Sequence, residues 1–266
     1  MSQADNNSQT IARLAEMLAP SRRILFITGA GMSADSGLPT YRGIGGLYNH
    51  EETEDGVSIE EALSGQMLQT RPELTWKYLA EIGRAAMSAS FNRGHEVIAE
   101  MEEHFEHVCV LTQNIDGFHR LAGSKNVIDI HGDMHTLYCT ACGFSQSVSR
   151  FDNIQIPPRC PQCPELLRPE VVLFGESLDT HKIEQLFSEL DEGFDFVFTI
   201  GTTSVFPYIA QPVHLARQLG WTSVEINPAQ SQVSEVVDHR LQTSAAAALD
   251  EIWQRYNQRI ERDNWS

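Results

Sequence analysis

Five short runs of β-branched and aromatic residues recur along the chain, and each is followed at once by glycine or polar residues. The runs are RILFIT (23–28), VCVLT (108–112), VIDI (127–130), FDFVFTI (194–200) and TSVEI (222–226). Stretches with the periodicity of amphipathic helices separate them, among them TIARLAEMLA (10–19) and DTHKIEQLFSEL (179–190). This alternation predicts an α/β fold in which helices wind a parallel sheet on both faces.

The residues that follow these runs lie where parallel sheets bind ligands, outside the carboxyl ends of the strands. They are Gly29, Gln113, Asn114, His131, Gly132, Gly201, Thr202, Thr203 and Asn227. We therefore expect one active-site rim, although a single Asn or Thr after a strand also serves as a turn residue or a helix cap.

The segment ITGAGMSADSGLPTYRG (27–43) begins like a dinucleotide loop. Gly29, Gly31 and Ala34 match the pattern of small residues that lets backbone N–H groups approach a pyrophosphate at a helix start. Pro39 cannot continue a helix. The sequence thus predicts a cradle that lacks the usual long helix after it.

Residues 45–90 and 134–170 fit the sheet poorly. The first stretch reads as an acidic loop followed by a pair of helices, and the second holds four cysteines and the proline-rich IPPRCPQCPELLRPE. We expect the two to form a smaller zinc-ribbon and helical domain inserted into a Rossmann-like domain of residues 11–44, 91–133 and 171–266. The cleft between the domains is the expected site, and the polar residues 1–10 are expected to be a disordered tail.

The cysteines form two CxxC units, Cys139 with Cys142 and Cys160 with Cys163, separated by 17 residues. Two such units close a tetrahedral four-thiolate site that leaves no open coordination position, so we expect one structural zinc ion. Iron in a rubredoxin-like site is the alternative. The fifth cysteine, Cys109, lies in an apolar run and is interpreted as a small core residue.

The charge balance makes direct nucleic-acid binding unexpected. Nineteen Lys and Arg against 36 Asp and Glu give a formal charge of −17, which would repel a phosphate backbone and attract lysine-rich partners. We expect no membrane segment and no signal peptide, because no apolar run is long enough and the N-terminus is polar. Thiolates kept as metal ligands fit a reducing compartment, so a cytoplasmic location is expected.

Seven blocks, in order, carry a resemblance to a known family. They are GAGMSADSGLPTYRG, TQNIDGFHRLAG, HGDMHTLYCTACG, CPQC, RPEVVLFGE, IGTTS and EINP. From about residue 20 to residue 252 the chain resembles the sirtuin family, the Sir2-like NAD-dependent protein lysine deacylases, of bacterial type. The fold that the resemblance implies is the one argued above, with a cleft that takes NAD and an acylated lysine from opposite sides.

The resemblance implies that NAD is a consumed co-substrate. The acyl oxygen attacks C1′ of the ribose as nicotinamide leaves, and the products are lysine, nicotinamide and O-acyl-ADP-ribose. Two other readings stay open: a mono-ADP-ribosyltransferase or NAD hydrolase on the same fold, and a non-catalytic NAD-sensing module. The implied partners are acyl-lysine proteins or peptides, which the sequence does not name; it also leaves the oligomeric state open.

The resemblance also assigns roles to individual positions. His131, which follows an apolar run and precedes a glycine, would take a proton from a ribose hydroxyl, and Asn114 would orient the ribose as the second catalytic residue; a capping role for His131 is the alternative. The cofactor-binding positions are Gly29, Ala30, Gly31, Ala34, Thr40, Tyr41, Arg42, Gln113, Asn114, Ile115, Asp116, Gly201, Thr202, Thr203, Asn227 and Ala245. Among them, Ile115 and Asp116 would line the nicotinamide pocket, and Ala245 would either touch adenine or serve helix packing. Val172, Phe174, Gly175 and Glu176 would pair with the substrate backbone as an added strand.

Three departures from the family pattern stand out: the first two concern cofactor binding, which should survive them, and the third bears on the substrate. Thr40-Tyr41-Arg42 stands where the family often has Asp-Phe-Arg, and GTTSVFP has Thr203 in place of a serine, with a following loop expected to be a residue shorter. The Tyr-x-x-Arg pattern that reads succinyl or malonyl groups is replaced by Leu79 and Ile82. We therefore expect an acetyl or a longer apolar acyl group.

Overall fold

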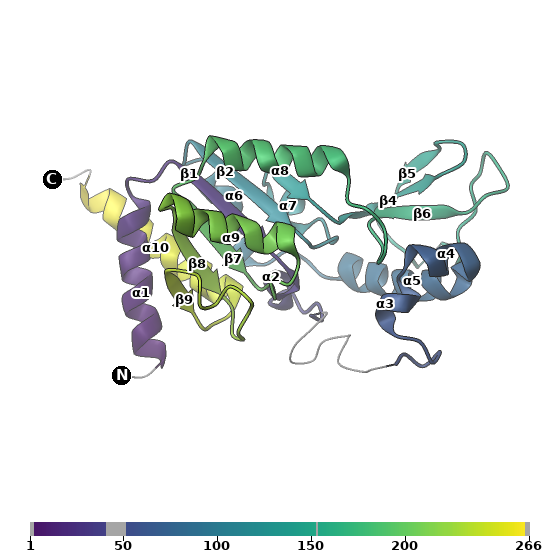
Figure 1. Cartoon of the computed structure of the whole chain (residues 1–266), viewed down its shortest axis with the longest axis horizontal. Coiled ribbons are helices and arrows are strands. Elements are labelled where there is room, and N and C mark those ends of the chain that lie inside the picture. Colours follow the sequence, from purple (N-terminus) through teal and green to yellow (C-terminus); the bar gives the residue numbers. More distant parts are fainter. Residues whose placement is uncertain (1–2, 41–51, 153, 264–266) are drawn as a thin grey trace.

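Six parallel strands form the main sheet. The structure, a computed structural model, describes residues 3–40, 52–152 and 154–263 (Figure 1). The strands are β1 (Arg23–Thr28), β2 (His107–Thr112), β3 (Val127–Asp129), β7 (Phe196–Ile200), β8 (Thr222–Ile226) and β9 (His239–Leu241). Their order is β3-β2-β1-β7-β8-β9, and every neighbouring pair is parallel. All five predicted runs are strands of this sheet, whereas β9 was not predicted because its short sequence is largely polar.

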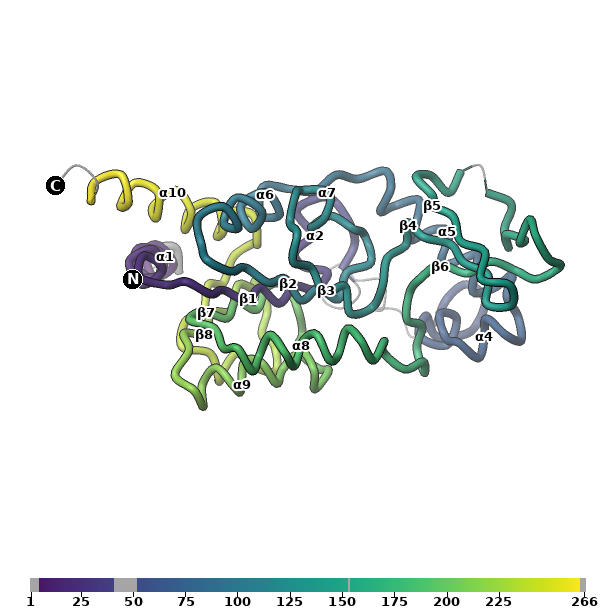
Figure 2. Tube along the Cα trace, turned by 90° about the horizontal axis from the view of Figure 1, so that it is seen from above, coloured from purple at the N-terminus to yellow at the C-terminus, as the bar shows by residue number. Residues whose placement is uncertain are grey.

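Helices cover both faces of the sheet, as predicted. The longer ones are α1 (Gln3–Leu18), α6 (Arg93–Met101), α8 (Thr180–Glu192), α9 (Pro207–Leu219) and α10 (Ala245–Asp263), and two short ones are α2 (Ala30–Ala34) and α7 (Phe118–Ala122). Ile24 and Phe26 of β1 pack in a core with residues of α1, α6 and α10, and Leu25 and Ile27 pack in a second core with α8 and α9. Figure 2 separates these layers, with α8 and α9 on one side of the strands and α6, α7 and α10 on the other. In the part of the chain described here, every helix is too short or too polar to cross a bilayer.

Residues 3–10 are helical, which corrects the expected disordered tail over residues 1–10 within the described part of that range. Helix α1 begins at Gln3 and packs along α10 and β9. Ser8 Oγ accepts a hydrogen bond of 2.8 Å from Arg255, and Asn7 Nδ2 donates one to the Gln242 carbonyl. The polar composition misled the prediction because a helix that buries one stripe accepts polar residues over the rest of its surface.

A smaller domain lies at one end of the molecule (Figure 1). Its antiparallel sheet has the order β5-β4-β6, and its elements are α3 (Ile59–Ala62), α4 (Gly65–Thr70), α5 (Pro72–Ser88), β4 (Gly132–Cys139), β5 (Ser145–Ser147) and β6 (Leu167–Val171). Residues of the helical insertion and of the cysteine segment share one hydrophobic core. Within it, Trp76 Nε1 of α5 donates to the Leu167 carbonyl of β6 across 3.1 Å. This shared core agrees with the expectation of a single small domain; its boundaries stay a prediction.

Candidate active site

The rim residues are positioned by the sheet itself. The amides of Gln113, Gly29, Gly201 and Asn227 donate to the carbonyls of Thr28, Ile200, Ile226 and Leu241, each across 3.0 Å. Each residue therefore continues the pattern of inter-strand hydrogen bonds one step beyond its strand. Because the strands are parallel neighbours, these residues meet at one edge of the sheet.

The glycines of the first loop allow it to pack directly on the loop after β7. The Gly31 amide donates to the Gly201 carbonyl at 2.8 Å, and a Cβ on Gly31 would lie 2.5 Å from the Cα of Gly201. A Cβ on Gly29 would lie 2.8 Å from the Gly201 carbonyl oxygen. Helix α2 then ends at Ala34, before Pro39, as the sequence predicted. Glycine at these positions is thus required by backbone packing, whatever the loop binds.

Asn114 is held at the centre of a buried hydrogen-bond network. Its Nδ2 donates to the Gly29 carbonyl at 3.0 Å and to Ser33 Oγ at 3.1 Å, and Ser33 Oγ in turn donates to Asp116 Oδ2 at 2.6 Å. Gln113 Nε2 donates to Thr202 Oγ1 at 2.8 Å. Ser33 lies within the glycine-rich segment 27–43 but was not among the residues predicted to form the site.

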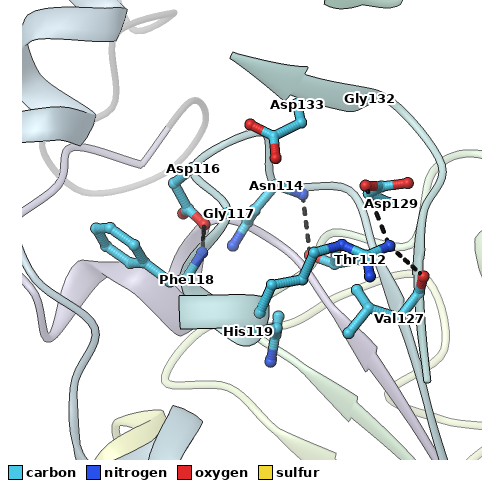
Figure 3. Close-up of a pocket in the computed structure, with 11 residues that line it drawn as sticks. Thr112, Asn114, Asp116, Gly117, Phe118, His119, Val127, Asp129, Gly132 and Asp133 are labelled. Carbon is cyan, nitrogen blue, oxygen red and sulfur yellow. Dashed lines mark hydrogen bonds and ion pairs between the residues drawn. The ribbon is translucent and has the colours of Figure 1, made fainter. Parts of the chain in front are cut away.

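Asp116 is buried at 6% exposure, and burial raises the pKa of its carboxyl group against the hydrogen bonds from Ser33 and the Phe118 amide. Figure 3 shows the loop of Asn114 and Asp116 beside the start of α7, where the Asn114 amide donates to Thr112 Oγ1 at 3.1 Å. Thr28 Oγ1 donates a hydrogen bond to Thr112 Oγ1 at 2.9 Å and lies 3.0 Å from Nε2 of the buried His119. The loop is therefore held by buried side chains, with Thr112 bonded to its backbone and Thr28 and His119 behind Thr112.

A large pocket opens between the two domains. Ala30, Ser33, Leu38, Pro39, Asn114, Ile115 and Asp116 line it from the main domain, and Ile59, Tyr78, Glu81, Ile82, Ala85 and Ala86 line it from the small domain. It encloses about 760 Å³, including space open to solvent. Ile82 faces this pocket, whereas Leu79 is 2% exposed and packs in the small-domain core. The expected cleft is present, and four of the expected cofactor residues line it.

His131 lies one residue beyond Ile130 at the same rim. Its Nδ1 is 3.0 Å from the Gln113 carbonyl oxygen, and its Nε2 is 2.7 Å from the hydroxyl of Tyr208. Burial lowers the pKa of the imidazole, and the positive charge of Lys182 lowers it further. The ring is therefore neutral at pH 7, as a general base must be. Tyr208 was missed, since only the fold brings it to His131.

The segment predicted to pair with substrate is already engaged with its own chain. The amide of Phe174 donates to the Leu63 carbonyl at 3.0 Å, and the carbonyl of Phe174 accepts from the Gly65 amide at 3.1 Å. The amide of Val172 donates to the His131 carbonyl at 2.9 Å. These particular backbone groups are occupied by the loop around α3 and α4 and by His131, so an added strand would have to use others.

Glu176 forms a bidentate ion pair with Arg168, at 2.6 and 2.8 Å, and its Oε2 also accepts from the Leu173 amide at 2.9 Å. The Glu176 carboxylate thus fastens this segment to β6. Gly175, between Phe174 and Glu176 in the sequence, has a positive φ of 81°.

The remaining residues predicted to bind the cofactor differ in how much of their side chains is accessible. Asn227 Nδ2 donates to the Thr202 carbonyl at 2.9 Å and its Oδ1 accepts from the Ala229 amide at 3.1 Å, so both ends of the amide are engaged. Ala245 is 3% exposed and packs in a core cluster, which leaves it little surface for adenine. Ala34 and Thr203 are exposed and Thr40 is half-buried. Tyr41 and Arg42 lie outside the described residues.

The four cysteines converge, as their spacing predicted. Their sulfur atoms all lie within 4.8 Å of one another, with Cys139 and Cys163 at 3.5 Å and Cys142 and Cys160 at 3.5 Å. These distances are far longer than a disulfide bond and close to the edge of a tetrahedron with zinc–sulfur bonds of about 2.3 Å. The Gln162 amide donates to Cys160 Sγ at 3.4 Å, as amides around metal thiolates do. Donor set and geometry fit one structural zinc ion.

Comparisons with known proteins agree on one family. The model of the Sir2 family matches residues 29–207. The NAD-dependent protein deacylase 2 of Pseudomonas aeruginosa is 51% identical over 245 residues, which cover 91% of this chain and 95% of that protein.

Among solved structures, a Sir2 homologue in complex with 2′-O-acetyl-ADP-ribose aligns with a TM-score of 0.83 at 34% identity, covering 93% of this chain and 97% of the other. A Sir2 homologue in complex with NAD aligns with a TM-score of 0.83 at 33% identity, covering 93% and 94%.

Proposed function

The chain belongs to the Sir2 family, and from this premise we propose that it is an NAD-dependent protein lysine deacylase that transfers the acyl group to ADP-ribose. The observation that carries the proposal is the arrangement of His131. It is half-buried, burial lowers the pKa of its ring, its Nδ1 is engaged by the Gln113 carbonyl, and its Nε2 carries the lone pair and meets the Tyr208 hydroxyl at the rim. The named relatives and the ligands of the aligned structures support the same reaction.

The rim fits NAD as co-substrate. When bound, NAD supplies the ribose carbon that the acyl oxygen attacks and the hydroxyl that later accepts the acyl group. Gly29 and Gly31 pack against the Gly201 loop with no room for side chains, and their amides donate to the Ile200 and Gly201 carbonyls. We propose that these glycines, with Ala30 between them, let the start of α2 lie close to a phosphate of NAD. Gln113 and Asn114 are proposed to orient the ribose, and Ile115 with Asp116 to hold the nicotinamide carboxamide beside the large pocket.

His131 is proposed to be the general base. Because a carbonyl oxygen only accepts hydrogen bonds, Nδ1 carries the proton and Nε2 carries the lone pair. Nε2 can therefore take a proton from a ribose hydroxyl, which then attacks the acyl carbon. The resulting imidazolium is stabilised by the Gln113 carbonyl, which favours the charged form of the ring.

The pocket favours an apolar acyl group. Its described lining from the small domain is mostly apolar, and the carboxyl groups on the described lining are Glu81 of the small domain and Asp116 of the main domain. The Tyr78 hydroxyl is committed to Asp55 Oδ2 at 2.6 Å. A succinyl or malonyl carboxylate would meet like charge there, so we propose acetyl or a longer apolar acyl group as the substrate.

The four-cysteine site is proposed to hold its zinc ion for structure only, since four thiolates complete the coordination sphere. The five cysteines are free of disulfides, which suits a reducing cytoplasm, and the net charge of −17 suits basic acyl-lysine partners. We propose a cytoplasmic location on this basis, which fractionation of cells expressing the protein tests.

The function is tested by incubating the protein with NAD and a panel of acetyl-, longer acyl- and succinyl-lysine peptides, followed by mass analysis. We expect deacylated peptide and O-acyl-ADP-ribose in equal amounts, and His131→Ala should still bind NAD but lose acyl transfer. Free ADP-ribose or ADP-ribosylated protein as the main product would instead indicate a hydrolase or an ADP-ribosyltransferase.

A further inference from the structure

The hydroxyl of Tyr208 occupies the nitrogen of His131 that the reaction needs. The Gln113 carbonyl fixes the proton of the neutral ring on Nδ1, so the 2.7 Å contact at Nε2 can only be a hydrogen bond donated by the tyrosine. We propose that Tyr208 is a positioning residue that holds His131 in its reactive tautomer and orientation in the free protein and is displaced from Nε2 by the ribose hydroxyl. This inference rests on the proposed function.

The short loop after β7 brings Tyr208 to this place. Ser204 adopts a positive φ of 54°, and α9 begins three residues later at Pro207, whose ring presets the first helical φ. Tyr208 therefore lies in the first turn of α9. Its ring stacks on Phe206 at 5.5 Å and 12°, and both rings meet the imidazole edge-on with centroids 6.0 Å away. The aromatic pair therefore packs against the His131 ring, and the Tyr208 hydroxyl reaches it at Nε2.

The tyrosine is suited to hold the base and unsuited to replace it. Burial raises the pKa of its phenol to about 12, so it stays protonated and donates at neutral pH. An imidazole nitrogen has one lone pair, which can take one strong hydrogen bond at a time. The phenol and the ribose hydroxyl therefore compete for the same site. Tyr208 is only partly buried, so its hydroxyl can leave Nε2 without opening the core.

The titration of His131 reports whether this hydrogen bond is present. A donor at Nε2 stabilises the neutral ring, because protonation of that nitrogen would break the bond. Around the ring, α9 contributes Tyr208, the loop after β2 contributes the Gln113 carbonyl, and α8 contributes Lys182, which pairs with Asp129 Oδ1 of β3 at 2.7 Å. Lys182 also disfavours the charged ring, and it is unaffected by a change at Tyr208.

The test is Tyr208→Phe, which keeps the ring and its stack and removes only the hydroxyl. In the ligand-free protein, NMR titration of His131, assigned by the signal absent from His131→Ala, should show its pKa raised by about half to one unit. With NAD and an acyl-lysine peptide, the acid limb of kcat/KM, which reports the free protein, should move by the same amount. The acid limb of kcat, which reports the complex, should stay in place.

Tyr256→Phe is the matched control, since Tyr256 is a buried tyrosine of α10 far along the chain from the rim. It should move none of these values. If Tyr208→Phe folds poorly, Tyr208→Leu removes the same hydroxyl and makes the same prediction.

An unchanged His131 pKa in the variants would show that Tyr208 does not donate a hydrogen bond to Nε2. A shift of the acid limbs of both kcat/KM and kcat, with a large loss of kcat, would show that the ribose hydroxyl does not displace Tyr208. If the wild-type protein deacylates none of the peptides, the proposed function fails, while the NMR titration still decides whether Tyr208 holds His131.

Discussion

Glu176 should stabilise the fold and contribute little to substrate binding. The Glu176→Ala variant removes three hydrogen bonds, two to Arg168 and one to the Leu173 amide. It leaves Arg168 with one acceptor among these contacts, the Val171 carbonyl at 2.9 Å. The side chains of Arg168 and Glu176 are 15% and 27% exposed.

This partial burial sets the expected cost. Exposed ion pairs contribute about 0 to 1 kcal/mol, and breaking a fully buried pair costs about 3 to 5 kcal/mol. The Arg168–Glu176 pair lies between these limits, so we expect Glu176→Ala to lose about 2 to 3 kcal/mol in the free energy of unfolding. Urea denaturation of the zinc-loaded protein measures it.

The control is Asp152→Ala, which breaks the ion pair with Arg150 in the same domain. Those side chains are 73% exposed for Arg150 and 52% for Asp152, so the change should stay within about 0.5 kcal/mol. A double-mutant cycle of Arg168→Ala and Glu176→Ala then isolates the coupling between the pair.

The Arg168–Glu176 pair should also make the free energy of unfolding depend on pH. Burial opposes ionisation of Glu176 most strongly, but Arg168 and the Leu173 amide outweigh it and lower the pKa of the carboxyl group. The contribution is therefore complete above the unfolded pKa and is lost as pH falls through the lower folded value. A Glu176→Ala variant of unchanged stability but with a much higher KM for peptide would refute this reasoning and favour a substrate-binding role.

Three further predictions test the zinc site, the cradle and the base. Removal of the metal by a chelator should open the small-domain core and expose Trp76, which a red shift of tryptophan fluorescence would show. The reason is that metal binding contributes about 10 kcal/mol or more to the folding of small zinc domains. An unchanged spectrum after complete metal loss would argue against a structural role for the metal. Gly31→Ala, whose Cβ would lie 2.5 Å from the Gly201 Cα, should cost about 1 to 3 kcal/mol in stability and weaken NAD binding by calorimetry; wild-type values for both would contradict the packing argument. Because burial lowers the pKa of His131 below 6.5, the base is active above its pKa and kcat/KM should already be level at pH 7; an acid limb centred above 7 would exclude it.

Local pattern was enough for much of the fold. Each of the five apolar runs became a strand because β-branched residues buried on both faces suit a parallel sheet, and the following polar residues met at one edge because parallel strands share direction. Composition was less informative for residues 3–10, where polar residues belong to a helix that packs against α10.

The sequence by itself determined five of the six strands of the main sheet and the four-thiolate cluster, since these follow from periodicity and ligand spacing within short stretches. Only the tertiary structure decided how side chains at the rim are shared. Tyr208 meets His131 across 77 residues, and the Phe174 backbone is occupied by the loop around α3 and α4. Such contacts depend on how separate elements pack against one another, and a hydrogen-bonding group in a linear sequence carries no record of which distant partner will take it.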